Sequence, residues 1–258
     1  MQEPVSTIQI TLPVRQLVEF LCRVGSIDNR FTGFDRANEG ARIHRKLPRA
    51  AVKENADYDA EVFLRGTFAY AEIEFTLEGR ADGIFTAAYG VTVVDEIKTT
   101  ACPAADITPD FAPEHWAQAM VYAAIYAAQH ELEEMRIQLT YFQVDEELIL
   151  RFERHYTAQQ LQEEVEALLA EYAPWARRAV EWKKARNSDL QAMQFPFPAY
   201  RPGQRAMAGE VYKVCRDGGQ LLCQAPTGTG KSMSVLFPAL TSMGNERAGP
   251  IFYLTARG

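Results

Sequence analysis

The stretch from Glu72 to Thr100 constrains the fold of this 258-residue chain more than any other, because its apolar residues alternate with charged ones. Side chains of a β-strand point alternately to the two faces of a sheet, so the alternation predicts strands with one buried face. We expect a meander of three strands here, with one connection at Gly79–Gly83 and a turn around Tyr89–Gly90. The acidic residues at the strand ends predict carboxylates gathered at one edge of the sheet.

Three charged side chains of this stretch are expected to converge. Glu96 and Lys98 are two residues apart and share one face of a strand, while Ile97 points to the other face, toward the core. If Asp82 lies at the same level on the neighbouring strand, two carboxylates meet there, and they need a cation between them, for which a hard divalent ion is suited. A lysine beside that ion could orient a water or stabilise negative charge. The pattern therefore predicts metal-assisted hydrolysis of a phosphodiester.

Asp82 followed by Glu96-Ile97-Lys98 resembles the core motif of the PD-(D/E)XK nucleases. Two flanking motifs resemble those of the RecB-like branch: G-x-x-x-H at Gly40–His44 and Q-x-x-x-Y at Gln118–Tyr122. All of these elements occur in the order typical of that family. The resemblance implies an α/β fold, with a restriction-endonuclease-like mixed sheet flanked by helices.

The same resemblance implies a role for each matching residue. The ligands of Mg²⁺ or Mn²⁺ would be His44, Asp82, Glu96 and the backbone carbonyl of Ile97. Lys98 would position the attacking water, and Gln118 and Tyr122 would support the site or the DNA backbone. The G-x-x-x-H motif is associated with exonuclease action on single strands, so single-stranded DNA is the expected partner.

A second motif lies in the last quarter of the sequence. Residues 225–232 read A-P-T-G-T-G-K-S, between an apolar run at Gln220–Gln224 and a helical pattern at Met233–Leu240 that Pro238 is expected to kink or shorten. A strand, a glycine-rich loop and a helix in this order predict a Walker A loop, whose amide groups bind phosphate. The residues expected to contact a nucleotide here are Thr227, Gly228, Thr229, Gly230, Lys231 and Ser232.

Tyr200–Gln204 before this loop and Ile251–Arg257 after it resemble motifs of superfamily 2 helicases of the DinG/XPD type. This resemblance implies ATP as a ligand, with Gln204 and nearby Arg201 reading the adenine, in an incomplete RecA-like P-loop segment. Because no Walker B acidic pair follows before Gly258, we expect ATP binding without turnover. The remaining helicase domains of a longer chain are implied as partners.

Two domains are expected, a nuclease domain over 1–187 and the start of a RecA-like motor domain over 188–258. The other elements expected in the first domain are a strand at Thr7–Leu12, helices at Val14–Val24 and about 35–51, a helix from Pro113, a hairpin of Arg136–Val144 and Glu147–Phe152, and a helix at Thr157–Arg186 with Thr157 as its N-cap and a break at Pro174.

The net charge of −7 counts against a strongly basic DNA-binding surface, although basic clusters occur at residues 42–53 and 177–186. The four cysteines form no C-x-x-C pair, so we expect reduced thiols and no iron–sulfur cluster. No segment has the length of an apolar membrane span and the N-terminus lacks a signal-peptide pattern, so a cytoplasmic protein without a membrane partner is expected.

Two alternative functions stay open. In the first, the nuclease fold is inactive and serves a DinG/XPD-like helicase as a DNA-binding module. In the second, ATP hydrolysis by the full-length motor is the whole function. The polarity of cleavage, the choice of DNA or RNA, and an endo- or exonucleolytic mode are not predicted by these residues.

Overall fold

The structure is a computed structural model that describes residues 7–24, 42–43, 47–48, 51–53, 55–87 and 90–255. Its residues divide into two compact units, Met1–Pro174 and Trp175–Gly258. The predicted domain boundary near residue 187 stays a prediction. The predicted helix at about 35–51 falls mostly outside the described residues, as do Gly40 and His44.

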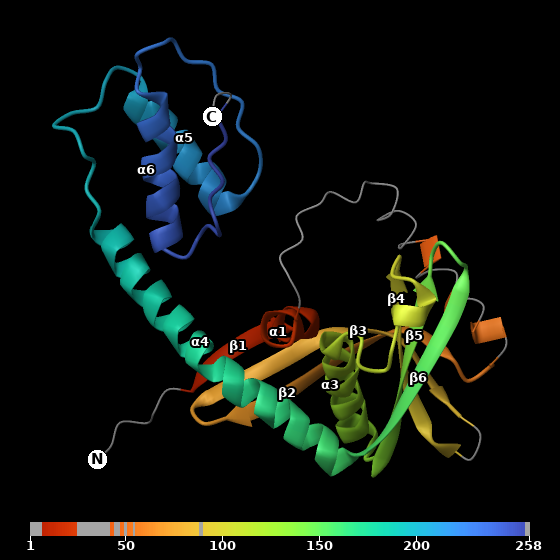
Figure 1. Cartoon of the computed structure of the whole chain (residues 1–258). Coiled ribbons are helices and arrows are strands. Elements are labelled where there is room, and N and C mark those ends of the chain that lie inside the picture. Colours follow the sequence, from red (N-terminus) through yellow and green to blue (C-terminus); the bar gives the residue numbers. More distant parts are fainter. Residues whose placement is uncertain are drawn as a thin grey trace, which may run out of the picture. The chain divides into compact units, whose positions relative to one another are not determined.

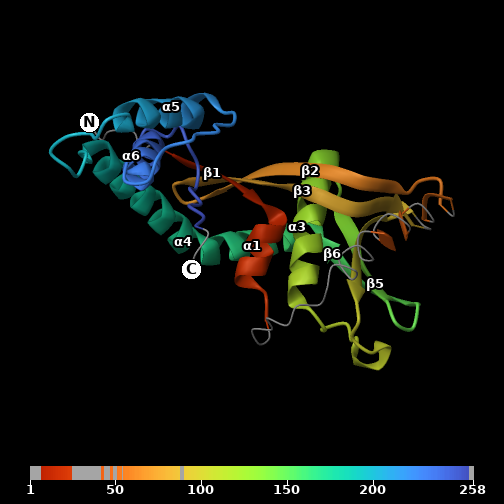
Figure 2. The ribbon, with the colours of Figure 1, turned by 90° about the horizontal axis from the view of Figure 1, so that it is seen from above.

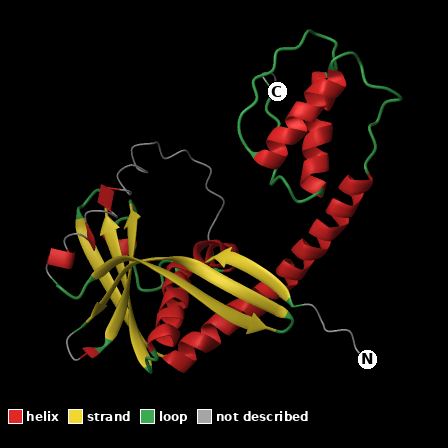
Figure 3. Ribbon diagram, turned by 180° about the vertical axis from the view of Figure 1, so that it is seen from behind, coloured by secondary structure: helices red, strands yellow, loops and turns green. Residues whose placement is uncertain are grey.

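The first unit is built on a six-stranded mixed sheet with the order β1-β3-β4-β5-β6, in which β2 also pairs with β3 (Figure 1). The strands are β1 (Ile8–Pro13), β2 (Asp59–Tyr70), β3 (Ile73–Thr86), β4 (Thr92–Thr100), β5 (Glu134–Gln143) and β6 (Leu148–Thr157). β1 runs parallel to β3 and β4 parallel to β5, whereas the other pairs are antiparallel. The predicted mixed sheet is confirmed. Figure 3 shows it from behind, with strands in yellow.

The prediction of a break at Gly79–Gly83 is wrong, because β3 runs unbroken from Ile73 to Thr86. β2, which the sequence analysis did not predict, pairs with it from Tyr70↔Ile73 to Asp59↔Ile84. The glycine-containing stretch thus has β2 beside it, with partners for Gly79, Arg80, Ala81 and Gly83. Backbone groups that are paired in this way hold a strand extended even where local composition favours a turn.

Helices cover one face of this sheet (Figure 2). They are α1 (Val14–Leu21), α3 (Pro113–His130) and the first part of α4 (Ala158–Ala192). Phe75 of β3 is fully buried, and its ring lies 6.2 Å from that of Tyr172 on α4, which also contacts Phe20 of α1. A 3₁₀ turn, η2 (Ala104–Asp106), lies between β4 and α3. The predicted starts of α1 and α3 are confirmed.

The predicted hairpin is confirmed as β5 and β6, and α4 follows it directly. The Thr157 hydroxyl accepts from the Gln160 amide at 3.2 Å while the Gln160 side chain accepts from the Thr157 amide at 2.9 Å, which is the reciprocal pattern of a capping box. Thr157 therefore starts the helix as predicted. The predicted break at Pro174 is wrong, because α4 continues through it to Ala192.

The second unit holds the last part of α4 with α5 (Gln204–Asp217) and α6 (Lys231–Gly244). The predicted strand at Gln220–Gln224 is wrong: these residues form no strand, and Leu222 is 100% exposed. A strand needs a partner for its backbone groups, and the described residues of this unit supply none. The RecA-like arrangement of strand, loop and helix is thus present only as loop and helix. α6 runs through Pro238, which neither ends nor shortens it.

None of the helices among the described residues combines the length and the apolar character that crossing a membrane requires. The four cysteines are free thiols.

Candidate active site

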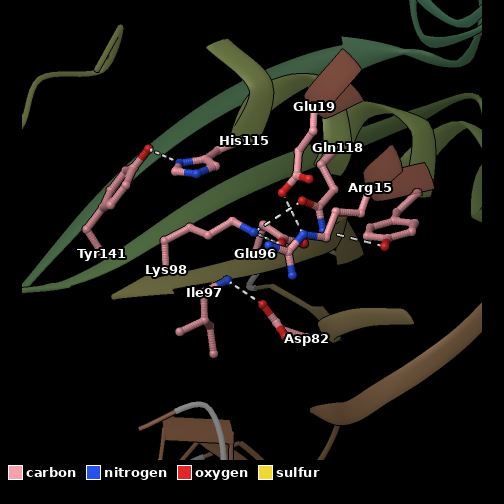
Figure 4. A network of polar contacts seen from close by, with 10 residues as sticks. Arg15, Glu19, Asp82, Glu96, Ile97, Lys98, His115, Gln118 and Tyr141 are labelled. Atoms are coloured by element: carbon pink, nitrogen blue, oxygen red, sulfur yellow. Dashed lines mark hydrogen bonds and ion pairs between the residues drawn. The ribbon is translucent and has the colours of Figure 1, made fainter. Parts of the chain in front are cut away.

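The centre of the candidate site is a gap in the pairing of β3. Along one edge, β3 pairs with β1 up to Glu78 and with β4 from Gly83 onward, so no strand of the described residues pairs with residues 79–82 there. The Asp82 carboxylate fills this gap and accepts a hydrogen bond from the Ile97 amide of β4 at 2.7 Å (Figure 4). This contact joins Asp82 to the strand that carries Glu96 and Lys98, as the sequence predicted.

Lys98 lies between two oxygen atoms on the face of the sheet that α3 covers. Its Nζ is 2.7 Å from Glu96 Oε1 and donates to Gln118 Oε1 at 3.1 Å (Figure 4). The Glu96 side chain is 2% exposed and that of Lys98 is 21% exposed. A buried carboxylate is costly without a cation beside it, and here the partly exposed Lys98 side chain supplies that charge.

Gln118 extends this chain of contacts along α3. Its Nε2 donates to the Tyr122 hydroxyl at 3.5 Å, one helical turn away. A Cβ on Gly79 would lie 2.6 Å from that hydroxyl, so only glycine leaves room for the tyrosine here. Burial, and then the nearby charges of Glu96 and Asp82, raise the pKa of Tyr122 to about 12. Tyr122 therefore keeps its proton at neutral pH beside both carboxylates.

Five predicted site residues thus come together: Asp82, Glu96, Lys98, Gln118 and Tyr122. The predicted ligand His44 lies outside the described residues. Among the described residues, no group of three His, Cys, Asp or Glu side chains is placed to hold a metal ion. The donors that the structure places at the site are therefore two carboxylates, with the Ile97 backbone beside them.

A buried polar cluster that was not predicted from the sequence lies on the opposite face of β4. Asp95 accepts hydrogen bonds from Tyr58 at 2.9 Å, from Gln138 at 2.9 Å and from Thr140 at 2.6 Å. Burial raises the pKa of Asp95, and these donors oppose that rise. The Tyr58 ring reaches Asp95 across Gly83, where an added Cβ would lie 1.9 Å from its hydroxyl. The cluster holds β4 in place on the face opposite to Glu96, because Asp95 directly precedes Glu96 in the chain.

A second pair that the sequence did not assign to the site is His115 with Tyr141. His115 lies near the start of α3, as predicted, and its Nδ1 is 2.9 Å from the Tyr141 hydroxyl. Tyr141 is the β5 residue in register with Lys98. Burial, and then the charges of Lys98 and Arg15, lower the pKa of His115 to about 3. The imidazole is therefore neutral over the whole physiological range.

This depressed pKa predicts a pH dependence of stability. Unfolded His115 takes up a proton near its usual pKa of 6.5 while the folded side chain does not, so the stability it contributes is full above 6.5 and is lost as the pH falls toward about 3. At pH 5 we expect a loss of roughly 1 to 2 kcal/mol in the free energy of unfolding. Urea unfolding at pH 7, 6 and 5 measures it, and His115→Gln should lack this part of the loss. An equal pH dependence in both proteins would contradict the assignment.

The glycine-rich loop of the second unit leads into α6, which begins at Lys231. Lys231 Nζ donates to the backbone carbonyls of Ala225 and Pro226, both at 3.0 Å. The Thr229 hydroxyl donates to the Pro226 carbonyl at 2.9 Å, and the Ser232 hydroxyl accepts from Tyr253 at 3.2 Å. Side chains of the loop thus donate to carbonyls of the same loop, in which Gly228 and Gly230 have positive φ.

Arg201 and Gln204, for which the sequence predicted a role in reading the adenine of ATP, both contact this loop, and that role stays a prediction. The Arg201 guanidinium donates to the Gly228 carbonyl, and Gln204 Nε2 donates to the Gly230 carbonyl at 3.1 Å. A cavity of about 440 Å³ lies between α5 and the loop. Its lining includes Gln204, Met207, Glu210, Cys223, Pro226 and Ser234.

Comparison with known proteins assigns most of the chain to a family. Residues 16–202 match the PD-(D/E)XK nuclease superfamily. No curated protein matches the chain. Among solved structures, one described as the crystal structure of SSO0001 is similar with a TM-score of 0.40 and 19% sequence identity, covering 66% of this chain and 78% of that chain.

Proposed function

The chain belongs to the PD-(D/E)XK nuclease superfamily, and we propose that it is a metal-dependent DNA nuclease acting at Asp82, Glu96 and Lys98. The observation that carries the proposal is the convergence of these three residues at the gap between β1 and β4. Two carboxylates that can bind a metal ion and one amine that can stabilise negative charge are suited to metal-assisted hydrolysis of a phosphodiester. We further propose that single-stranded DNA is the substrate and that cleavage is exonucleolytic.

The residues at the site fit a hard divalent cation. Asp82 and Glu96 offer oxygen donors from neighbouring strands. Mg²⁺ is commonly bound by one or two carboxylates, with waters and substrate phosphate as its other ligands. Asp82, Glu96 and the Ile97 carbonyl would therefore hold Mg²⁺ or Mn²⁺, with His44 as a further predicted ligand. When bound, the cation would act as a Lewis acid toward the scissile phosphate.

The chain's own side chains prepare the site for an attacking water. Glu96 and Gln118 hold the Lys98 amine in one place. The amine can then orient the water and stabilise the negative charge that develops on the oxygens of the phosphate. The Tyr122 hydroxyl accepts from the Gln118 amide and keeps its own proton, so it is the donor of this pair toward an oxygen of the DNA backbone. Preorganised donors of this kind need no rearrangement during the reaction.

Digestion of single strands labelled at the 5′ or 3′ end tests the proposal. The protein should degrade them with Mn²⁺ or Mg²⁺ and leave them intact in EDTA, and the label retained on short products gives the polarity. Strands that bind but stay intact under every metal condition would instead support the inactive DNA-binding module.

A second candidate activity, ATP binding, is favoured by one observation: Arg201 and Gln204 contact the same loop that carries Lys231. We propose that this loop, with Thr227 and Ser232, binds the phosphates of ATP and that the helicase domains of a longer chain would complete the motor. A fluorescent ATP analogue should bind the wild-type chain and not Lys231→Ala. Binding that is equal in both proteins, or absent from the wild type, would count against it.

A further inference from the structure

We propose that His115 contacts the nucleic-acid strand directly, donating a hydrogen bond from Nε2 to an oxygen of the sugar-phosphate backbone next to the scissile phosphate. The inference deepens the proposed function and rests on nucleic acid being the ligand of this site. No role in a nuclease site was predicted for this residue from the sequence.

The position of His115 supports a contact beside Lys98. His115 precedes Gln118 by three residues on α3, so both lie on one face of the helix, and Gln118 contacts the Lys98 amine. Tyr141, which contacts His115, is the neighbour of Lys98 across the parallel pair of β4 and β5. His115 thus continues the line of polar groups that begins at Asp82 (Figure 4).

The hydrogen bond with Tyr141 defines which nitrogen of His115 carries the proton. Tyr141 is 1% exposed, and its buried hydroxyl needs an acceptor for its proton. His115 Nδ1 is the partner that the described residues give this hydroxyl, so we assign Tyr141 as donor and Nδ1 as acceptor. A neutral imidazole that accepts at Nδ1 carries its proton on Nε2. Burial and the nearby cations, which lower the pKa of His115 to about 3, keep the ring in this neutral form.

The charges around His115 are suited to a phosphate-bearing ligand. Lys98 and Arg15 both act on it electrostatically, and Arg15 is 73% exposed on α1 in an ion pair with Glu19 at 2.7 Å (Figure 4). Cations supply the salt-dependent part of binding to nucleic acid, because each phosphate contact releases counterions. A neutral donor adds affinity and orientation without releasing an ion. This difference separates His115 from its charged neighbours in an experiment.

The test is the binding of a fluorescent single-stranded oligonucleotide in EDTA, followed by anisotropy at several salt concentrations. His115→Leu should weaken binding about five- to tenfold at every salt concentration, the effect of one uncharged hydrogen bond. The slope of log affinity against log salt should stay unchanged. His115→Gln, which keeps a neutral donor, should recover most of the affinity. Arg15→Gln, the control in which a charge is removed, should lower the magnitude of the salt slope by about 0.7.

Three results would overturn the inference: His115→Leu binding like the wild type, His115→Leu changing the salt slope as Arg15→Gln does, or His115→Gln binding no better than His115→Leu. Tyr141→Phe provides a second route, because it removes the partner of Nδ1 and leaves the imidazole in place. It should weaken binding by a smaller factor than His115→Leu, and an unchanged affinity would count against the assigned proton. The measurement needs no metal and no cleavage, so a protein that binds through His115 but never cuts would refute only the proposed nuclease activity.

Discussion

Replacing Lys98 with methionine is expected to lower the rate of metal-dependent strand cleavage by about two orders of magnitude or more. Methionine keeps an unbranched chain of similar length but removes the amine that Glu96 and Gln118 hold at 2.7 and 3.1 Å. The water and the developing charge would then lose their positioned cation. Initial rates on an end-labelled strand with Mn²⁺ measure the effect.

The control for this variant is Arg136→Met, which removes an exposed cation from the adjacent strand β5. Arg136 forms a long ion pair of 3.7 Å with Glu153, and a surface pair of this kind contributes little to stability. Its cleavage rate should equal that of the wild type. Cleavage by Lys98→Met at the rate of this control, with both variants folded by circular dichroism, would contradict the role given to Lys98.

Replacing Gly83 with alanine is expected to lower the free energy of unfolding by about 2 to 4 kcal/mol. The added methyl group would lie 1.9 Å from the Tyr58 hydroxyl, so the ring would have to leave its position. The hydrogen bond from Tyr58 to Asp95 would then be lost, and a buried carboxylate would keep fewer donors. Urea unfolding monitored by circular dichroism measures the loss.

A double-mutant cycle shows whether the collision with Tyr58 is the cause. In a Tyr58→Ala background the space beside Gly83 is open, so Gly83→Ala should cost at least about 1.5 kcal/mol less than in the wild type. An equal cost in both backgrounds would mean that the effect comes from the backbone of β3 and that the contact with Tyr58 contributes nothing.

The residues of the candidate site could be predicted because local rules place them. Alternation along a strand puts Glu96 and Lys98 on one face, and a four-residue spacing puts Gln118 and Tyr122 one turn apart on a helix. Asp82 was predicted to lie beside them and does, although through a hydrogen bond to the Ile97 amide at a gap in the pairing. The roles of these residues stay predictions.

The missed features depend on contacts between residues far apart in the sequence. The donors to Asp95 lie 37 to 45 positions away from it, and no local pattern connects them. One signal was present: Asp95 shares a strand face with Ile97, which was predicted to face the core, so a buried carboxylate was implied. The unbroken β3 is likewise a consequence of its pairing with β2, which extends from Ile73 to Ile84.

The wrong strand at Gln220–Gln224 shows the reverse case. Its composition favours an extended segment, but a strand exists only as part of a sheet, and the described residues of the second unit contain no neighbouring strand. Local composition therefore predicted the loop and α6 correctly and could not predict the sheet.

The central claim is that Asp82 and Glu96 together bind one divalent cation, and calorimetric titration with Mn²⁺ tests it most directly. The wild-type chain should show one site at the nuclease unit, and Asp82→Asn and Glu96→Gln should each weaken its affinity at least about tenfold. Glu153→Gln, which removes an exposed carboxylate from β6, should bind as the wild type does. Equal Mn²⁺ affinity in the wild type, Asp82→Asn and Glu96→Gln would contradict the claim.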